Sequence, residues 1–167
     1  MKIRRRARVI ALQTLFEIDC VGHDPTQVLK ESLKTGALPE EGHALCRELV
    51  LGVLSHTDRL DRAIHLLAPE WPMDQMGLID RNILRMAIFE IASRSDAPVK
   101  VVANEAVELA KLFGSDSSKR FINGVLGTLI SQMESTGGKL DRTLEKLASS
   151  SELPKEGGQQ VEESEPA

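Results

Sequence analysis

Apolar residues recur along most of the chain at the three- and four-residue spacing of an amphipathic α-helix. Sustained alternation of apolar and polar residues between hairpin turns, which would indicate β-strands, is missing. The pattern therefore predicts an all-α fold. The expected helices, about seven in number, cover residues 3–19, 26–34, 40–67 with a break near 56–58, 75–94 and 101–113, and a last helix ends at Met133.

Glycines and short polar residues indicate how the later helices begin and end. We expect Gly114 at the C′ position after the fifth apolar pattern, and Ser115 or Asp116 as the N-cap of the last helix. Gly124 and Gly127 lie three residues apart on that last helix. Their spacing predicts that a neighbouring helix approaches closely there.

The length of 167 residues, with 41% hydrophobic residues, suits one domain with a substantial core. Residues 75–94 are apolar on most sides, which is typical of a central helix. After Met133 the composition changes to Ser, Gly, Glu and Lys, interrupted by a short amphipathic stretch at 140–147. We therefore predict a folded domain over 1–133 and an acidic, largely disordered tail over 134–167.

Charge is distributed unevenly along the chain. The net charge is −4, but residues 131–167 contain eight acidic and four basic side chains, so the rest of the chain is balanced. The chain begins with a basic block, defined as Lys2, Arg4, Arg5, Arg6 and Arg8, and its first acidic residue is Glu17. Cations at a helix start oppose the helix dipole. Because no acidic partner lies one turn away, we expect these side chains to bind a phosphate backbone.

Residues that could read bases are few. The chain has no Tyr, one Trp and four Phe, which argues against a sheet of base-stacking aromatics. Base contacts would come from polar side chains such as Gln13, with Phe121 either a stacking surface or a core residue.

Other functional classes have less support. The sequence has no GxSxG, P-loop or HExxH motif, so we expect no enzyme and no cofactor. A metal site near His43 and Cys46, or among His56, Asp58, Asp61 and His65, would lack a complete ligand set. Cys20 and Cys46 are expected to be buried thiols of a cytoplasmic protein, since the first helix resembles neither a signal peptide nor a membrane span.

Three segments together resemble the NusB family of bacterial transcription antitermination factors. They are Arg4-Arg5-Arg6-Ala7-Arg8 leading to Ala11-Leu12-Gln13-Thr14-Leu15-Phe16, then Asp80-Arg81-Asn82-Ile83-Leu84-Arg85-Met86-Ala87, and finally Pro98 through Asn104-Glu105-Ala106-Val107-Glu108-Leu109-Ala110-Lys111 to Phe121-Ile122-Asn123-Gly124-Val125-Leu126. The likeness covers residues 3–130 in the family's order and spacing.

This resemblance implies two packed three-helix bundles with one extra short helix. It implies binding of single-stranded boxA RNA from ribosomal RNA leaders together with NusE, a small-subunit ribosomal protein, so that RNA polymerase resists termination. The implied RNA contacts are the basic block, Gln13, Ser118, Lys119, Arg120 and Phe121. The residues implied to face NusE are Phe16 and Asp80.

Two positions depart from the family pattern. Phe16 lacks the hydroxyl that is common there, and Ser117 stands where some relatives have an acidic residue. Glu105 and Asn123 are expected to satisfy buried backbone or helix-end groups. A related interaction module without RNA function remains an alternative, as does a homodimer that hides the RNA surface.

Overall fold

The computed structural model describes residues 2–93 and 97–142. This part of the chain is helical, without strands, which confirms the predicted fold class. A further helical turn begins at Leu140. The main helices are α1 (Ile3–Val21), α2 (Pro25–Gly36), α3 (Glu40–Ser55), α4 (Thr57–Leu67), α5 (Leu78–Ala92), α6 (Val99–Phe113) and α7 (Ser118–Ser135).

Local interactions explain several helix ends. α1 ends at Gly22, whose φ of 73° is left-handed and therefore suits glycine. The Asp24 side chain caps α2 by accepting a hydrogen bond from the Thr26 backbone N–H, with Pro25 in the first turn. The break between α3 and α4 falls at His56, inside the predicted interval.

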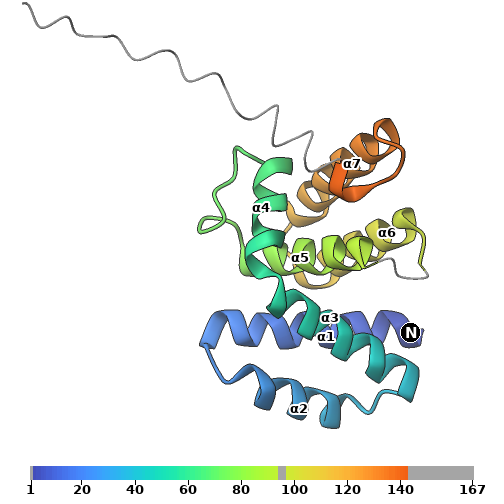
Figure 1. Cartoon of the computed structure of the whole chain (residues 1–167). Helices are drawn as coiled ribbons and strands as arrows, with labels where there is room; N and C mark the ends of the chain where they lie inside the picture. The colour runs from blue at the N-terminus through green and yellow to red at the C-terminus, as the bar shows by residue number, and fades with distance from the viewer. Residues whose placement is uncertain (1, 94–96, 143–167) are drawn as a thin grey trace, which may run out of the picture.

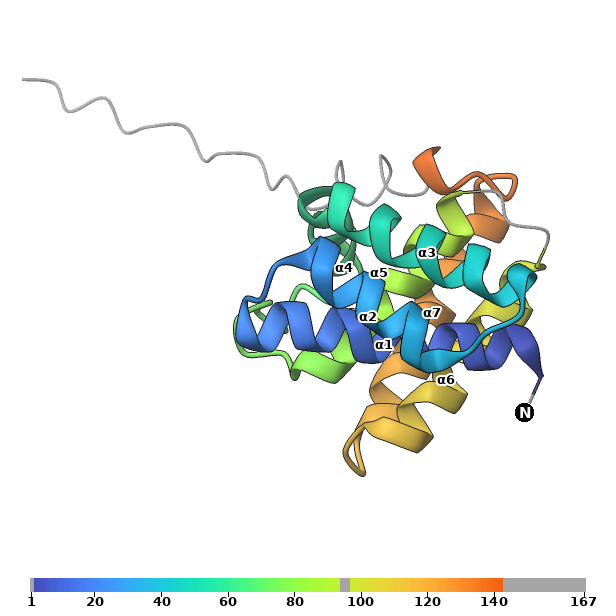
Figure 2. The same ribbon diagram turned by 90° about the horizontal axis from the view of Figure 1, so that it is seen from below.

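The helices form two groups that pack across one another, as the resemblance implied (Figure 1). α1, α2 and α3 contact each other and form the lower group in this view. α5, α6 and α7 form the second bundle, beside which α4 is the extra short helix. The view from below shows α2 and α3 lying along α1 (Figure 2).

α5 joins the two groups and is the central helix, as predicted. It contacts α1 and α3 on one side and α4, α6 and α7 on the other. Its residues from Asn82 to Ile88 are all buried. The predicted stripe on α7 is also buried and comprises Ile122, Val125, Leu126, Leu129 and Met133.

The close helix approach predicted at Gly124 and Gly127 was wrong, whereas Gly114 follows the end of α6 as predicted. A Cβ at Gly124 or Gly127 would meet no atom of the described residues within 4 Å, so none of the helices α1 to α6 approaches there. Close approach occurs instead at Gly52, where a Cβ would lie 2.0 Å from Cζ of Phe89. Gly114 is extended rather than left-handed, with φ −83° and ψ −179°. It is confined because a Cβ there would lie 2.4 Å from that of Ser118.

The start of α7 and one thiol also differ from expectation. Neither Ser115 nor Asp116 is the N-cap of α7, which begins after Ser117 without a side-chain cap. Cys20 is exposed near the end of α1, whereas Cys46 is buried, and burial raises the pKa of its thiol to about 11.

The ordered chain continues past the predicted domain end. α7 extends two residues beyond Met133, and Leu140 packs partly buried against the core. The remainder of the predicted tail, residues 143–167, lies outside the described residues.

Candidate nucleic-acid interface

The basic block occupies the first two turns of α1, and its side chains differ sharply in exposure. Arg8 is only 5% exposed, and its guanidinium donates two hydrogen bonds to the Glu90 carboxylate of α5. Arg5 is 39% exposed and donates from Nε and Nη2 to Glu105 of α6, both at 3.0 Å. These two arginines therefore have acidic partners from distant helices.

The remaining block residues are less constrained. Arg6 donates to the Gly36 carbonyl oxygen of α2 at 3.3 Å. Arg4 lies 3.8 Å from an exposed carboxylate, Glu41, which is a weak surface contact. Lys2 is exposed. The inference that all five cations are free for phosphate therefore does not hold for Arg8, which is buried, and holds only in part for Arg5.

Sequence reasoning missed these partners because it searched within one helical turn. Arg8 and Glu90 are 82 residues apart, and Arg5 and Glu105 are 100 apart. Glu105 was expected to satisfy a backbone or helix-end group, but its partner is the Arg5 side chain. Hydrogen bonding from Arg5, opposed by burial, lowers the pKa of Glu105. Asn123 is exposed.

Gln13 lies on the side of α1 that faces α2. It is exposed and lines a groove between the two helices, together with Ile10 and Thr35. Arg6 reaches toward the same helix, whereas Arg5 reaches toward α6. The basic block therefore spreads around α1 instead of forming one stripe.

The second predicted set lies at the start of α7, where Lys119 and Arg120 are exposed. Ser118 is buried, and its hydroxyl oxygen accepts a hydrogen bond from the Ser115 backbone N–H, so its role is to shape the turn. Phe121 is half-buried and meets Trp71 edge to face, with ring centroids 5.8 Å apart. Phe121 therefore matches both predicted alternatives in part. It packs partly against the core, as a core residue does, and it remains partly accessible, as a stacking surface must be.

α6 lies between the two basic sets. The pKa of Glu108 is lowered, first by its hydrogen bond with Lys111 and then also by the charges of Arg5 and Lys119. The Glu108 carboxylate therefore interacts electrostatically with Arg5 at the start of α1 and with Lys119 at the start of α7. Arg5 and the start of α7, more than 100 residues apart in sequence, therefore lie near the same segment of α6, whereas Arg4 and Arg6 reach toward α3 and α2.

The residues expected to face a protein partner lie on α1 and α5. Phe16 is half-buried on α1. Asp80 lines a cavity of about 300 Å³ with Trp71, Gln75, Ser115, Ser117 and Phe121. Asp80 therefore lies directly beside the aromatic pair at the start of α7.

A network that sequence reasoning missed fixes the end of α1 against α5. The Asp19 carboxylate accepts hydrogen bonds from Arg81 at 2.6 and 2.8 Å and from Asn82 at 2.9 Å. Although burial raises the pKa of Asp19, the hydrogen bonds and charges of these partners lower it overall. Arg85 adds a contact to Asp19 and pairs with Asp61 of α4. The charged and polar residues from Asp80 to Arg85 were recognised in the sequence as a motif. Their partners, Asp19 and Asp61, lie on other helices and could not be identified from the sequence.

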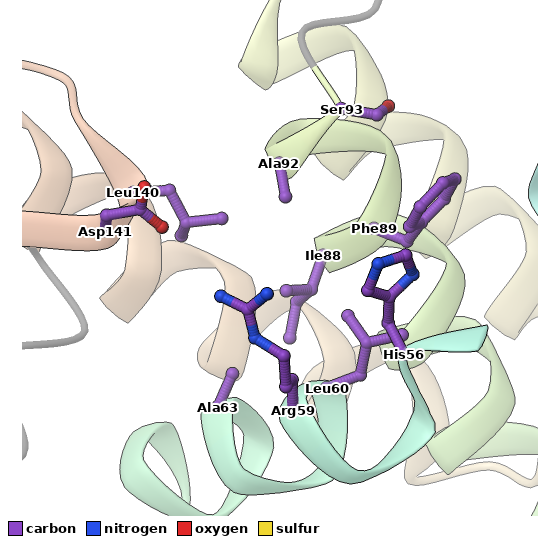
Figure 3. A pocket seen from close by; sticks show the side chains of 10 residues that line it. All are labelled: His56, Arg59, Leu60, Ala63, Ile88, Phe89, Ala92, Ser93, Leu140 and Asp141. Atoms are coloured by element: carbon purple, nitrogen blue, oxygen red, sulfur yellow. The ribbon is translucent and has the colours of Figure 1, made fainter. Parts of the chain in front are cut away.

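A second cavity, of about 380 Å³, lies between α4, α5 and the turn at Leu140 (Figure 3). None of the predicted site residues lines it. His56 stacks there on Phe89, and its Nδ1 lies 2.9 Å from the Gly52 carbonyl oxygen. In residues 2–93 and 97–142, no three His, Cys, Asp or Glu side chains are grouped as metal ligands. No helix in the same ranges is long and apolar enough to span a membrane.

Comparison with known proteins places this geometry in context. The family model described as "NusB family" matches residues 5–131. A relative from Roseiflexus sp. (strain RS-1), named "Transcription antitermination protein NusB", is 51% identical over 132 residues, which cover 78% of this chain and 93% of the relative.

Solved structures of NusB proteins have the same fold as this chain. T. maritima NusB superimposes with a TM-score of 0.68 at 28% identity, over 86% of this chain and 91% of that one. A chain from the structure titled "Crystal Structure of Antitermination Factors NusB and NusE in complex with dsRNA" has a TM-score of 0.68 at 25% identity, over 76% and 95%. Because the family model matches residues 5–131 and the Roseiflexus relative is 51% identical, the chain belongs to the NusB family.

Proposed function

We propose that this protein is a transcription antitermination factor that binds boxA-type single-stranded RNA of ribosomal RNA leader transcripts together with NusE. In this role it joins the antitermination complex that lets RNA polymerase resist termination, and it performs no catalysis. Support comes from the 51% identical relative named for antitermination and from the related structure that contains NusB, NusE and RNA.

The observation that carries the proposal is the pair of exposed basic sets on either side of α6. Arg5 from α1, which pairs with Glu105 of α6, and the exposed Lys119 and Arg120 from α7 supply cations on both sides of α6, and Lys2, Arg4 and Arg6 extend the basic surface around α1. Guanidinium groups and ammonium groups bind phosphates, so a single strand crossing α6 meets cations at both ends. Arg5 joins this set when it exchanges Glu105 for phosphate, and Arg8 holds α1 in place.

For NusE, Phe16 supplies an apolar contact on α1 without a hydroxyl. Asp80, the other residue that the resemblance assigns to NusE, lies beside Phe121 at the RNA-facing end of α7. The two surfaces therefore meet at the start of α5.

The test is a titration of fluorescently labelled boxA RNA with the full chain, with and without NusE. About four phosphate contacts on a single strand predict roughly fiftyfold weaker binding at 200 mM than at 50 mM salt. Substituting Lys119 and Arg120 by Ala should reduce both the affinity and this salt dependence. Arg47→Ala, an exposed arginine on α3, is the matched control. Binding that is independent of salt, or unaffected by the double substitution, would exclude this surface.

A further inference from the structure

Two sets of polar contacts join α1 to α5, one near each end of α1. Near its start, Arg8 pairs with Glu90 at the end of α5. Near its end, Asp19 accepts hydrogen bonds from Arg81 and Asn82 at the start of α5. The two helices therefore run antiparallel, and α1 supplies the cation at one contact and the anion at the other. Because α1 and α5 belong to different helix groups, these contacts fix how the two groups lie against each other.

The contact at Asp19 is the more exposed of the two. The side chains of Asp19 and Arg81 are 19% and 18% exposed, whereas those of Arg8 and Glu90 are 5% and 4% exposed. Exposed ion pairs are weaker than buried ones, whose loss leaves an unpaired charge inside the protein. The end of α1 at Asp19 is therefore the end of this boundary that is held less firmly by the ion pair itself.

Further hydrogen bonds connect Asp19 to neighbouring segments. Arg81 also donates from Nη1 to the Met73 carbonyl oxygen at 3.3 Å, in the turns that precede α5. Arg85 donates to Asp19 at 3.3 Å and to both carboxylate oxygens of Asp61 on α4, at 2.6 and 2.9 Å. One carboxylate on α1 thereby connects α4, α5 and the turns between them.

The two residues that the resemblance assigns to NusE flank this contact. Phe16 lies three residues before Asp19, which is about one turn of α1, so the two share one side of the helix. Asp80 directly precedes Arg81 on α5. Since Phe16 and Asp80 belong to different helix groups, the distance between them depends on how the end of α1 is held against α5.

We propose that Asp19, Arg81 and Asn82 are positioning residues of the NusE-binding surface, and that the hydrogen bonds of the Asp19 carboxylate hold Phe16 and Asp80 in the arrangement that NusE contacts. The proposal rests on the NusE binding proposed above and adds to it the residues that act through Phe16 and Asp80.

Preorganisation explains why such a contact matters for binding. A partner that contacts two helices binds more tightly when they are already held in the bound arrangement, because less conformational freedom is lost. Without the Asp19 carboxylate, the end of α1 can shift against α5, while the Arg8–Glu90 pair still holds the start of α1. Loss of Asp19 should therefore weaken NusE binding and leave RNA binding by the chain alone nearly unchanged.

The first experiment is a titration of fluorescently labelled NusE with the full chain. Asp19→Ala should weaken NusE binding roughly tenfold. Asp19→Asn should lose less, because its amide oxygen can still accept a hydrogen bond from Asn82. Labelled boxA RNA, titrated without NusE, should bind wild type and Asp19→Ala with affinities that agree within about twofold.

Leu33→Ala is the control for a general loss of stability, because it shortens a buried core side chain on α2. At a temperature where circular dichroism shows every variant to be folded, Leu33→Ala should bind NusE as wild type does. Asp19→Asn and Arg81→Met carry the same comparison if Asp19→Ala does not fold.

A double-mutant cycle separates positioning from direct contact with NusE. If Asp19 and Arg81 act through their shared hydrogen bonds, Asp19→Ala combined with Arg81→Met should weaken NusE binding little more than either change alone. Two residues that each touch NusE independently would instead give losses that multiply.

Three results would overturn the proposal and leave the proposed function standing. They are NusE binding by folded Asp19→Ala that equals wild type, losses that multiply in the double variant, and an equal loss of RNA and NusE binding in Asp19→Ala. Failure of the wild-type chain to bind NusE would instead remove the proposed function together with this inference.

Discussion

Arg8 was predicted to bind phosphate, but in the structure it forms a buried ion pair with Glu90. Both side chains are almost fully buried, and each satisfies the other through two hydrogen bonds. Removing one member of a buried pair leaves an uncompensated charge, which is far more costly than losing a surface contact. Arg8 therefore fixes the start of α1 on α5, and in the proposed function it supports the RNA surface without contacting RNA.

Arg8→Ala should lower the free energy of unfolding by about 3–5 kcal/mol. Replacing both partners, as in Arg8→Met with Glu90→Leu, should cost much less because no charge is left buried. Urea unfolding measures both variants. An Arg8→Ala protein as stable as wild type would show that the pair is not formed in solution.

Arg5 is held by Glu105, which would compete with RNA for its guanidinium in the proposed function. Glu105→Gln keeps the side-chain shape but removes the charge that holds Arg5, so the guanidinium gains one more phosphate contact. The salt dependence of RNA binding should become steeper by about 0.7 in slope. Glu41→Gln removes a nearby exposed charge at 3.8 Å from Arg4 and is the control for a general charge effect. Equal slopes for the two variants would argue against a specific Arg5–Glu105 competition.

Asp19 predicts a pH dependence of stability. Its pKa is lower in the folded protein than its ordinary value of about 3.9, so the unfolded chain binds the proton more readily. The stabilisation from Asp19 is therefore fully present above about pH 4 and is lost as the pH falls through the lower folded pKa. Asp19→Asn should reduce the decline in unfolding free energy over this acidic range, whereas Asp58→Asn should not. Identical acid profiles for wild type and Asp19→Asn would contradict the network.

At the scale of helices, the sequence predicted which helices exist and in what order, but not which residues make the contacts between helices. The apolar periodicity identified every main helix and the central position of α5, because periodicity follows directly from which face is buried. It predicted α5 over 75–94, while the helix covers Leu78–Ala92. The preceding residues form turns instead, with the Gln75 and Met76 N–H groups bonded to the Pro72 carbonyl oxygen. Turns of this kind have no hydrophobic periodicity, so they could not be predicted from the apolar pattern.

Helix–helix approach was not predictable because it depends on the partner. Gly124 and Gly127 have the spacing of a contact site but face open space, whereas Gly52, with no such spacing, abuts Phe89. Spacing within one helix says nothing about where the neighbouring helix lies.

This contrast gives a paired prediction. Gly52→Ala would place a Cβ against the Phe89 ring, so it should destabilise the fold by about 1–3 kcal/mol unless the ring moves. Gly124→Ala meets nothing and replaces a flexible helical residue, so it should stabilise by about 0.5–1 kcal/mol. Denaturant unfolding of the two variants should shift in opposite directions. A common direction would mean that α3 and α5 are not in this register.

At the scale of the molecule, the candidate surface could be predicted only in part. The basic block and the start of α7 were found from the sequence and its resemblance, and the fold brings Arg5 of that block and the start of α7 to the same segment of α6. The burial of Arg8 and Ser118 and the place of Trp71 beside Phe121 needed the tertiary arrangement. Which arginine is free is decided by helices that lie 80 or more residues away.

The net charge of the whole molecule predicts how fast RNA associates with it. Residues 143–167 contain six acidic and two basic side chains, so removing them makes the formal charge zero. A truncation after Arg142 keeps Leu140 and should speed RNA association at low salt, because long-range repulsion falls. The difference should vanish at high salt, where charges are screened. Stopped-flow association at two salt concentrations measures this, and an unchanged rate at low salt would show that the tail has no electrostatic role.

The pairing of Arg8 with a residue 82 positions later also bears on how the chain folds during synthesis. Contacts between distant residues form late because a long loop must close first. While the ribosome is still making α5, the basic block has no Glu90 or Glu105 to neutralise it. The nascent N-terminus is thus more cationic than the finished protein, and completion of α5 and α6 restricts its attraction for nucleic acid.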